Sequence, residues 1–453
     1  MNLLALLAGL LPWAATPVSA FTRVYVACSL LSIEVQVATW LGRGTLRSLV
    51  PLNLLIAAIV IGWHIRSRRP AWGWVRRTRS LLPIPVVIGL LVVVATTDLW
   101  RTVEAADPYQ MERVLEIQRT GTLAYSSRID PKANIIGGFY ELMLADVRSV
   151  PALGPSLTQL HGVGGLLVFA LAVAAVQTWL PLPQSVWART LLFVVPVVFN
   201  QLVLVKNDLF IGAPAFVVLA WAIGSSSRDL QEVWWAGWLV GLVVAGKLTN
   251  AAVAVAVGAS VLLRYRHWRP VLTLGAGVVT GIIAAGFALT LWQNARWYGD
   301  PLATAQVGAL GGFNQGANAV AVGAGRFLLS LVDLGVATRY LWPGRGGWGG
   351  TFGLPFVWAL VILLVCARSQ PLARRALLAG LLSLFALGVT FPDADLSHRL
   401  VLGPGLLIIA AAASVADGLD RRLVTETLVV VVVLSAIQIL RSAVLYATAT
   451  GGV

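Results

Sequence analysis

Apolar runs long enough to cross a lipid bilayer recur along the whole of this 453-residue sequence. Backbone polar groups inside a hydrocarbon layer are satisfied only in helices or closed barrels, and a spanning helix needs about 20 apolar residues. The composition agrees, because 58% of the residues are hydrophobic, 11% are charged and the mean hydropathy is +0.83. We predict an all-α polytopic membrane protein with about 12–14 transmembrane helices, which excludes a soluble enzyme, a disulfide scaffold and a disordered chain.

Clusters of arginine separate many of the apolar runs. Residues 66–79 contain six arginines and no acid, so we expect this stretch in the cytoplasm, where basic residues near helix ends accumulate. Alternation from that anchor places the later clusters on the same side: Arg228; Arg264, Arg266 and Arg269; Arg368, Arg374 and Arg375; Arg421 and Arg422. The net charge of +14 therefore fits cytoplasmic loops better than a nucleic-acid partner.

The same alternation makes residues 99–160 a large first extracytoplasmic loop, and its mixture of acids and bases differs from the arginine-only loops. We divide the chain into N-terminal transmembrane helices with a basic loop (1–81), a transmembrane core with the outer loop (82–410) and a C-terminal helix region (411–453). The first apolar run, 2–20, has no basic residue before it, so we expect a retained helix rather than a signal peptide. The Gly-rich region 294–350 is expected to form an outer loop.

Two carboxylates of the first outer loop are candidates for chemistry. Asp107 precedes Pro108 and an amphipathic stretch that ends at Gly121, so it is either the N-cap of a short interfacial helix or a base at the edge of the bilayer that accepts a proton from an incoming hydroxyl. Glu141 approaches the next apolar boundary, and it is either a solvated or paired surface residue or a second acid of a site.

A second outer segment brings polar residues to the start of an apolar helix. Asn207 and Asp208 either cap that helix or direct a carboxylate toward the first loop. Lys247 lies in a tight outer turn, where its ammonium either extends to the surface or binds a phosphate. The only other lysines, Lys132 and Lys206, fall on the same side, and compact ammonium charges suit phosphate oxygens.

Near the C-terminal third, Arg399 stands at an outer helix boundary and could hold a phosphate by two hydrogen bonds. Asp393 and Asp395 form a pair that could bind a divalent cation, although such pairs are common by chance. We predict no other cofactor. The four histidines lack metal-ligand spacing. Signatures of nucleotide-binding loops, zinc proteases and nucleophilic triads are absent from the sequence.

The order of these elements resembles the GT-C superfamily of polyprenyl-phosphate-sugar glycosyltransferases, including protein mannosyltransferases and the aminoarabinose transferases of lipid A. Members carry an acid in a large first outer loop, usually as Asp-x-x-Tyr followed by a short helix and a glycine. This sequence has Asp107-Pro108-Tyr109 and then Thr120-Gly121, with the tyrosine one place early and no histidine after it. The resemblance covers roughly residues 82–410. The three apolar runs before residue 66, at 2–20, 24–41 and 51–65, have no counterpart in the simplest members.

Later elements follow the family's order. They are Lys132 to Leu142, Asn207-Asp208, Gly246-Lys247, Trp297-Tyr298-Gly299-Asp300-Pro301, and Arg399 to Pro404.

The resemblance implies transfer of a sugar from a polyprenyl-phosphate donor to an acceptor hydroxyl, with inversion at the anomeric carbon. Asp107 would deprotonate the acceptor, and Asp208 would position the acceptor or share the role of the base. Cationic side chains would neutralise the leaving phosphate. The expected phosphate ligands are Lys132, Lys247 and Arg399, and the expected substrate-binding residues are Tyr109, Glu112, Glu141, Asn207 and Asp300.

The implied partners are the donor lipid, an acceptor that is a lipid, glycan or protein, and the bilayer. The Ala, Val, Gly and Arg bias indicates a bacterial inner membrane, with the site on the extracytoplasmic face. A flippase or exporter of a lipid-linked saccharide is the main alternative. Transporters keep ionisable residues near the bilayer midplane, whereas the acids here map to loops and helix ends, which favours surface chemistry. A structural assembly subunit is a third interpretation.

Overall fold

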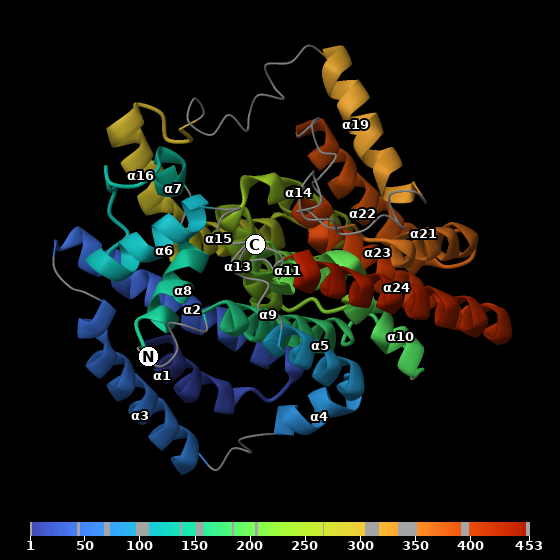
Figure 1. Ribbon diagram of the computed structural model, residues 1–453, viewed down its shortest axis with the longest axis horizontal. Helices are drawn as coiled ribbons and strands as arrows, with labels where there is room; N and C mark the ends of the chain where they lie inside the picture. Colours follow the sequence, from blue (N-terminus) through green and yellow to red (C-terminus); the bar gives the residue numbers. More distant parts are fainter. Residues whose placement is uncertain are drawn as a thin grey trace.

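A computed structural model shows the arrangement of the helices (Figure 1). It describes residues 2–42, 46–67, 73–96, 108–135, 138–150, 157–183, 185–203, 207–265, 267–303, 317–333, 351–390 and 398–449. Within these ranges every regular element is a helix. The predicted all-α class is therefore confirmed.

The α-helices are α1 (Asn2–Leu10), α2 (Pro17–Trp40), α3 (Val50–Arg66), α4 (Gly73–Leu81), α5 (Ile84–Thr96), α6 (Pro108–Thr120), α7 (Pro131–Ile135), α8 (Phe139–Arg148), α9 (Leu157–Val176), α10 (Val186–Leu191), α11 (Pro196–Val203), α12 (Asp208–Gly224), α13 (Leu230–Gly246), α14 (Ala251–Tyr265), α15 (Trp268–Ala284), α16 (Phe287–Tyr298), α19 (Ala317–Val332), α21 (Leu354–Cys366), α22 (Pro371–Thr390), α23 (Leu402–Val415) and α24 (Arg421–Ala449). Short 3-10 helices are η1 (Leu11–Trp13), η2 (Leu46–Leu49), η4 (Leu192–Val194), η5 (Leu248–Asn250), η7 (His398–Val401) and η8 (Ala416–Gly418).

Several helices can cross a membrane. Four are long and apolar enough by themselves: Pro17–Trp40, Leu46–Arg66, Gln159–Val176 and Arg421–Arg441. Three bent helix pairs pass the same test, which brings the number of candidate spans in the described residues to as many as seven, and shorter apolar helices lie beside them. The chain is thus a multi-pass membrane protein, whereas the count of 12–14 spans and a GT-C-like arrangement stay predictions.

Two apolar runs of the sequence, 186–199 and 271–293, are broken in the structure. The run at 186–199 bends by 52° between η4 and α11, where Pro196 lacks the amide hydrogen needed to continue the preceding helix. The run at 271–293 bends by 65° between α15 and α16 at Gly286, whose φ of +81° favours glycine. Gln36 of α2 donates a hydrogen bond to the Ile283 carbonyl oxygen at 3.1 Å, beside this bend.

Two further boundaries differ from the sequence-based expectation. The run at 2–20 is not one helix, because α1 ends at Leu10 and α2 begins at Pro17, with the Thr16 hydroxyl accepting a hydrogen bond from the Ser19 amide at 3.2 Å. The Gly-rich region expected to be an outer loop contains α19, while residues 344–350 lie outside the described ranges. Pro17 at the first helical position and a threonine cap were the sequence signals for the new helix start.

Helices α13 and α15 are parallel and touch backbone to backbone. Gly237 and Gly241 of α13 face Gly277 and Gly281 of α15, so both helices present small residues four positions apart. A Cβ atom at Gly281 would lie 2.1 Å from the Trp238 carbonyl oxygen. Such small-residue pairs let membrane helices approach closely, where dispersion contacts replace the hydrophobic driving force that lipid does not supply.

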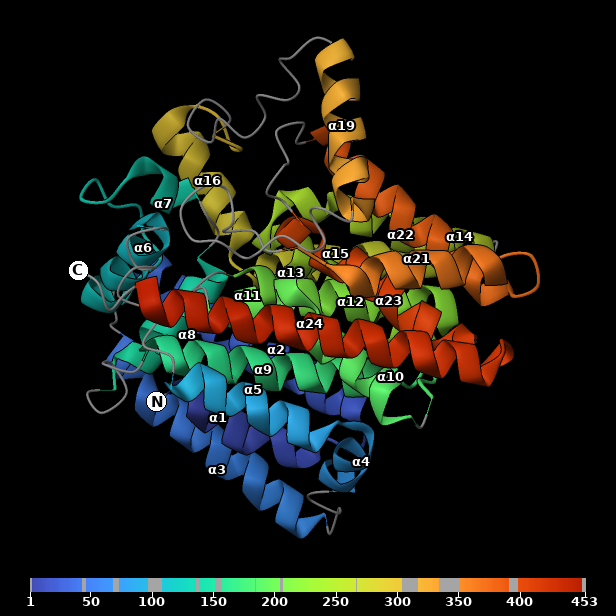
Figure 2. The ribbon, with the colours of Figure 1, turned by 45° about the vertical axis from the view of Figure 1, so that its right-hand side comes forward.

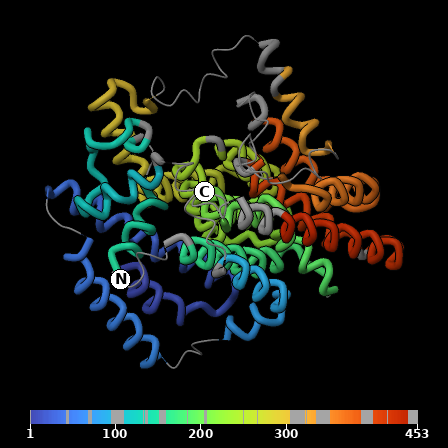
Figure 3. Tube along the Cα trace, in the orientation of Figure 1, coloured from blue at the N-terminus to red at the C-terminus, as the bar shows by residue number. Residues whose placement is uncertain are grey.

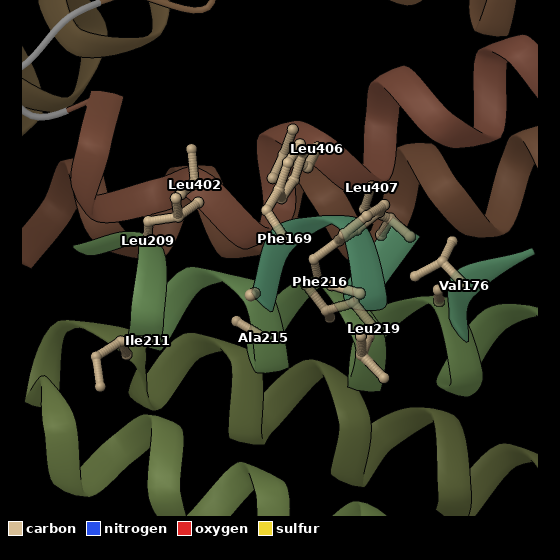
Figure 4. Packing of buried hydrophobic residues seen from close by; sticks show 14 of the residues in the cluster. Phe169, Val176, Leu209, Ile211, Ala215, Phe216, Leu219, Leu402, Leu406 and Leu407 are labelled. Carbon is tan, nitrogen blue, oxygen red and sulfur yellow. The ribbon is translucent and has the colours of Figure 1, made fainter. Parts of the chain in front are cut away.

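Helix α12 occupies the centre of the bundle. Nearly all of its side chains are buried, which is the pattern of a helix surrounded by other helices. Figure 4 shows Phe216 and Leu219 of α12 close to Leu407 of α23, with Phe169 of α9 beside Leu406. The helices α9, α12 and α23 therefore form the core against which the outer helices pack.

The N-terminal and C-terminal helices lie on opposite sides of this core (Figure 3). Contacts cross the predicted boundary at residue 81, because α2 packs against α9 and α15. The Tyr25 hydroxyl of α2 donates a hydrogen bond to the Phe210 carbonyl oxygen of α12 at 2.6 Å. The division into 1–81, 82–410 and 411–453 stays a prediction, and the first helices are packed into the same bundle as the rest.

The bundle has two ends, and Figure 2 shows α6, α7 and α16 gathered at one of them. At the opposite end Arg264 and Arg375 donate hydrogen bonds to carbonyl oxygens at the C-terminus of α12, to Trp221 and Ile223 respectively, both at 3.3 Å. The other end is where α12 begins. The first-loop helices α6, α7 and α8 lie there, together with α16, which packs against α7. We call these the arginine end and the loop end. The 17 residues of α12 separate them by about 25 Å.

The glycine contact gives a stability prediction. Gly281→Leu should overpack the α13–α15 interface and lower the stability of the folded protein by about 1–3 kcal/mol or more. Thermal unfolding of the purified protein in detergent measures this as a lower melting temperature. Gly275→Leu on the same helix is the matched control, because a Cβ there meets nothing within 4 Å. Equal melting temperatures for the two variants would contradict the packing argument.

Candidate functional site

The predicted site residues differ in how much of them the structure describes. Asp107 lies outside the described ranges, as do Asp393 and Asp395. For Tyr109, Lys132 and Arg399 the described part includes the backbone only; these residues belong to α6, α7 and η7. The side chains that can be followed are Glu112, Glu141, Asn207, Asp208, Lys247 and Asp300.

Asp208 and Lys247 form an ion pair at the loop end. The Asp208 carboxylate starts α12 and the Lys247 ammonium follows the last residue of α13, and Nζ of Lys247 donates to Oδ1 of Asp208. The Asp208 side chain is 1% exposed and that of Lys247 is 20% exposed. Sequence analysis predicted both residues but not that they touch. Because the two helices are antiparallel neighbours, the start of one and the end of the other meet.

Asn207 is buried beside this pair. It occupies the N-cap position of α12, but its side chain makes no capping hydrogen bond, so the helix-cap interpretation of this residue is wrong. Its Oδ1 is buried and has no hydrogen-bond partner in the described part of the chain. A buried carboxamide oxygen without a partner is costly, and it is a group that a ligand hydroxyl or amide would satisfy.

A buried hydrogen-bonded chain runs next to the ion pair. His161 of α9 accepts at Nδ1 from the Tyr140 hydroxyl of α8 and donates from Nε2 to the Gln201 carbonyl oxygen of α11 at 3.0 Å. The carbonyl can only accept, so Nε2 of the ring carries a proton. Burial raises the pKa of the Tyr140 hydroxyl well above its usual value, and the charges of Glu141 and Asp208 raise it further.

Glu141 is 2% exposed, so the interpretation as a solvated residue is wrong, whereas the paired interpretation stays open. Buried Arg113 of α6 provides a nearby positive charge. Its guanidinium donates to the carbonyl oxygens of Leu123 and Ala124 at 3.0 and 3.1 Å. Burial lowers the pKa of Arg113 to about 10, while Glu141 and Glu116 act in the opposite direction. Arg113 therefore holds the segment that follows α6 and interacts electrostatically with Glu141 of α8.

Glu112 and Asp300 belong to a second group of residues, around α6, α7 and α16. Glu112 accepts a hydrogen bond from the Asp130 amide at 2.8 Å, and Asp300 accepts one from the Leu302 amide at 2.9 Å. The ring of Tyr125 stacks on that of Trp297, with centroids 4.4 Å apart and planes 15° apart. Both carboxylates thus hold loop backbone in place, and their predicted contact with substrate stays a prediction.

The short helix η7, whose second residue is Arg399, packs against α11, α12 and η5. The predicted phosphate ligand is therefore in a segment adjacent to both members of the ion pair. His398 anchors this segment: its Nε2 lies 2.9 Å from the Ser330 hydroxyl, and its ring stacks on Phe352 at 5.8 Å. Burial lowers the pKa of His398 to about 4, so the imidazole is neutral at pH 7.

Sequence analysis missed four polar residues of this region: Arg113, Tyr140, His161 and Gln201. The sequence features that could have marked these four residues as part of the site were weak. Arg113 lies on the buried side of α6 together with Gln110 and Glu116, so the sequence pattern did not mark that side as buried. Tyr140, His161 and Gln201 come from three different helices, and only packing brings them together.

A metal centre has no support in the described residues, which contain no group of three or more His, Cys, Asp or Glu side chains able to hold an ion. The chemistry available at the loop end is that of a buried carboxylate–ammonium pair, a hydrogen-bonded histidine–tyrosine pair and an unsatisfied carboxamide. No protein-family model, curated protein or solved structure matches this chain.

The ion pair gives a second stability prediction. Lys247→Met should lower the stability by about 3 kcal/mol, because it leaves the Asp208 carboxylate buried without its ammonium partner. The double variant Asp208→Asn/Lys247→Met should recover part of that loss. Thermal unfolding of both variants in the same detergent measures the difference. If the double variant is as unstable as the single one, the pair does not contribute as inferred.

The buried imidazole gives a pH prediction. Between pH 6.5 and 4 the unfolded chain protonates His398 while the folded chain does not, so stability falls with pH over this range, by up to about 3 kcal/mol. His398→Gln should lose this part of the pH dependence when melting temperatures are compared from pH 7.5 to 4. The control His267→Gln replaces an exposed histidine and should follow the wild type. Identical profiles for all three proteins would contradict the prediction.

Proposed function

We propose that this protein is an integral membrane glycosyltransferase that moves a sugar from a polyprenyl-phosphate donor to an acceptor hydroxyl at the loop end of the bundle. The observation that carries the proposal is the contact between Asp208 and Lys247, with η7 packed against the segments on which both residues lie. A carboxylate, an ammonium and the segment containing Arg399 are thereby close to one another at a membrane boundary. Lipid-phosphate sugar transfer needs these groups in one place.

The contact refines the roles of the two residues. A carboxylate that already neutralises an ammonium is a weaker base. Asp208 is therefore better suited to position the acceptor and Lys247 than to remove a proton. Lys247, held by Asp208 and partly exposed, can still direct hydrogen bonds to a phosphate oxygen. Asn207, with its unsatisfied Oδ1, fits an acceptor or sugar hydroxyl.

In the proposed reaction Asp107 removes the proton of the acceptor hydroxyl. The acceptor oxygen forms a bond to the anomeric carbon, and the bond from that carbon to the phosphate oxygen breaks with inversion. Polyprenyl phosphate leaves with the electron pair, and Lys247, Lys132 and Arg399 offset its charge. The base role fits Asp107 because α6, which begins at the next residue, belongs to the loop end.

The test is release of polyprenyl phosphate from polyprenyl-phosphate-linked sugars by the purified protein in lipid. Asp107→Asn should lower the rate by about 100-fold or more through loss of the base. Asp208→Asn should lower it about 10-fold or more through misplaced groups. Glu426→Gln, an exposed carboxylate on α24, is the matched control and should retain activity.

Two outcomes would overturn the proposal. If Asp107→Asn and the wild type release polyprenyl phosphate equally, Asp107 is not the base. If the wild type releases none from any donor but moves saccharide-linked lipid between leaflets, the protein is a flippase and the loop end is a binding site for its cargo.

A further inference from the structure

A cavity of about 940 Å³ opens at the arginine end, far from the residues of the proposed reaction. It lies where α2 and α13 begin and where α9 and α12 end, and α4 and α10 close its side. Its lining includes Trp221 and Glu232, whereas Asp208 and Lys247 lie at the opposite ends of the same two helices. The mouth of the cavity is therefore separated from the loop end by the length of α12, about 25 Å.

The polar part of the lining is mainly cationic. Arg23 of α2, Arg77 of α4 and Arg189 of α10 line the cavity, and Glu232 is the one acid among its described lining residues. Nη1 of Arg189 donates to the Ser80 carbonyl oxygen at 2.7 Å, which fixes the guanidinium against α4. Its Nε is buried with no hydrogen-bond partner in the described chain. Guanidinium groups from three separate elements thus face one space.

The deeper part of the lining is apolar. Val26 of α2 lies nine residues beyond the start of its helix, and Leu239 of α13 lies nine residues beyond the start of its own. Val217 and Val218 of α12 line the space between them. At 1.5 Å per residue the apolar lining extends about 13 Å along the helices from the arginine end. A ligand that fills the cavity needs a charged head and a hydrocarbon part.

The surroundings indicate the depth at which such a head would lie. Trp179, Trp221 and Trp235 line the cavity, and tryptophan is enriched where headgroups meet hydrocarbon. Helix α4, with Arg76, Arg77 and Arg79, is bent by 91° from α5, so it runs across the end of that helix, as a helix on a membrane surface does. The arginines are thus at the level of lipid headgroups.

We propose that this cavity binds a phosphate-bearing anionic lipid, with the phosphate on Arg23, Arg77 and Arg189 and a hydrocarbon chain along α12 and α13. Guanidinium groups bind phosphate oxygens by paired, charge-assisted hydrogen bonds, and basic pockets between membrane helices are typical of lipid headgroup sites. The volume falls within the range of small-molecule sites, which suits a headgroup and the first part of a chain. The proposal does not depend on glycosyl transfer at the other end.

The experiment is lipid binding to delipidated protein in a neutral detergent, measured by native mass spectrometry. Phosphatidylglycerol should bind at least 10-fold more tightly than phosphatidylcholine, which has a phosphate but no net charge. Arg189→Gln and Arg77→Gln should each weaken phosphatidylglycerol binding about 5-fold or more. Arg422→Gln is the matched control, because this exposed arginine of α24 pairs with Glu426 outside the cavity.

A shape variant tests the apolar part separately. Thr22→Trp introduces a large ring from the half-buried face of α2 that lines the cavity, with no change in charge. It should reduce phosphatidylglycerol binding without lowering the melting temperature as a core defect would.

Arg77 is exposed on a surface helix, so Arg77→Gln tests the charge in a protein expected to fold normally.

Further binding measurements identify which class of phosphate-bearing ligand occupies the cavity. Tighter binding of polyprenyl phosphate than of phosphatidylglycerol would support the site and assign it to isoprenoid lipids, and the reverse order would assign it to membrane phospholipids. Competition by inorganic phosphate as effective as that by either lipid would overturn the lipid proposal. So would unchanged phosphatidylglycerol binding in the arginine variants and in Thr22→Trp.

Discussion

The need to satisfy backbone polar groups inside a bilayer is the constraint on which the rest of this structure depends. Continuous helices meet it without help, and every interruption needs a partner from elsewhere. Gln36 reaches the Ile283 carbonyl oxygen at the bend between α15 and α16, and the Thr351 carbonyl oxygen accepts from the Val197 amide at 2.7 Å, beside the bend before α11. Polar side chains are therefore concentrated at helix breaks and helix ends, and the candidate sites are found there.

Helix α12 explains why the two ends of the bundle carry different charged side chains. The partial positive charge of its N-terminus favours the Asp208 carboxylate, and the partial negative charge of its C-terminus favours Arg264 and Arg375. Neighbouring helices then place an ammonium beside the carboxylate and further arginines around the adjacent cavity. One buried helix thus organises a mixed-charge region at the loop end and a cationic region at the arginine end.

Both proposals use phosphate chemistry, but they differ in what the charges do. At the loop end Lys247 is paired with Asp208, which suits a group that must bind a leaving phosphate and then release it. At the arginine end three guanidinium groups face a cavity with one acid, which suits lasting attachment of a lipid. The two regions share α12 and α13, so a ligand at one end contacts the same helices that carry Asp208 and Lys247 at the other.

The sequence by itself determined the helical class and the membrane environment, because apolar run length is a local property. It also marked Asp208 and Lys247 singly. Only the tertiary structure decided that these two touch, that Glu141 is buried beside Arg113, and that Tyr140, His161 and Gln201 form one chain. Those contacts join helices separated by up to about 40 positions, and nothing local to any of them encodes the partner. The glycine contact of α13 with α15 likewise depends on which neighbour each helix meets.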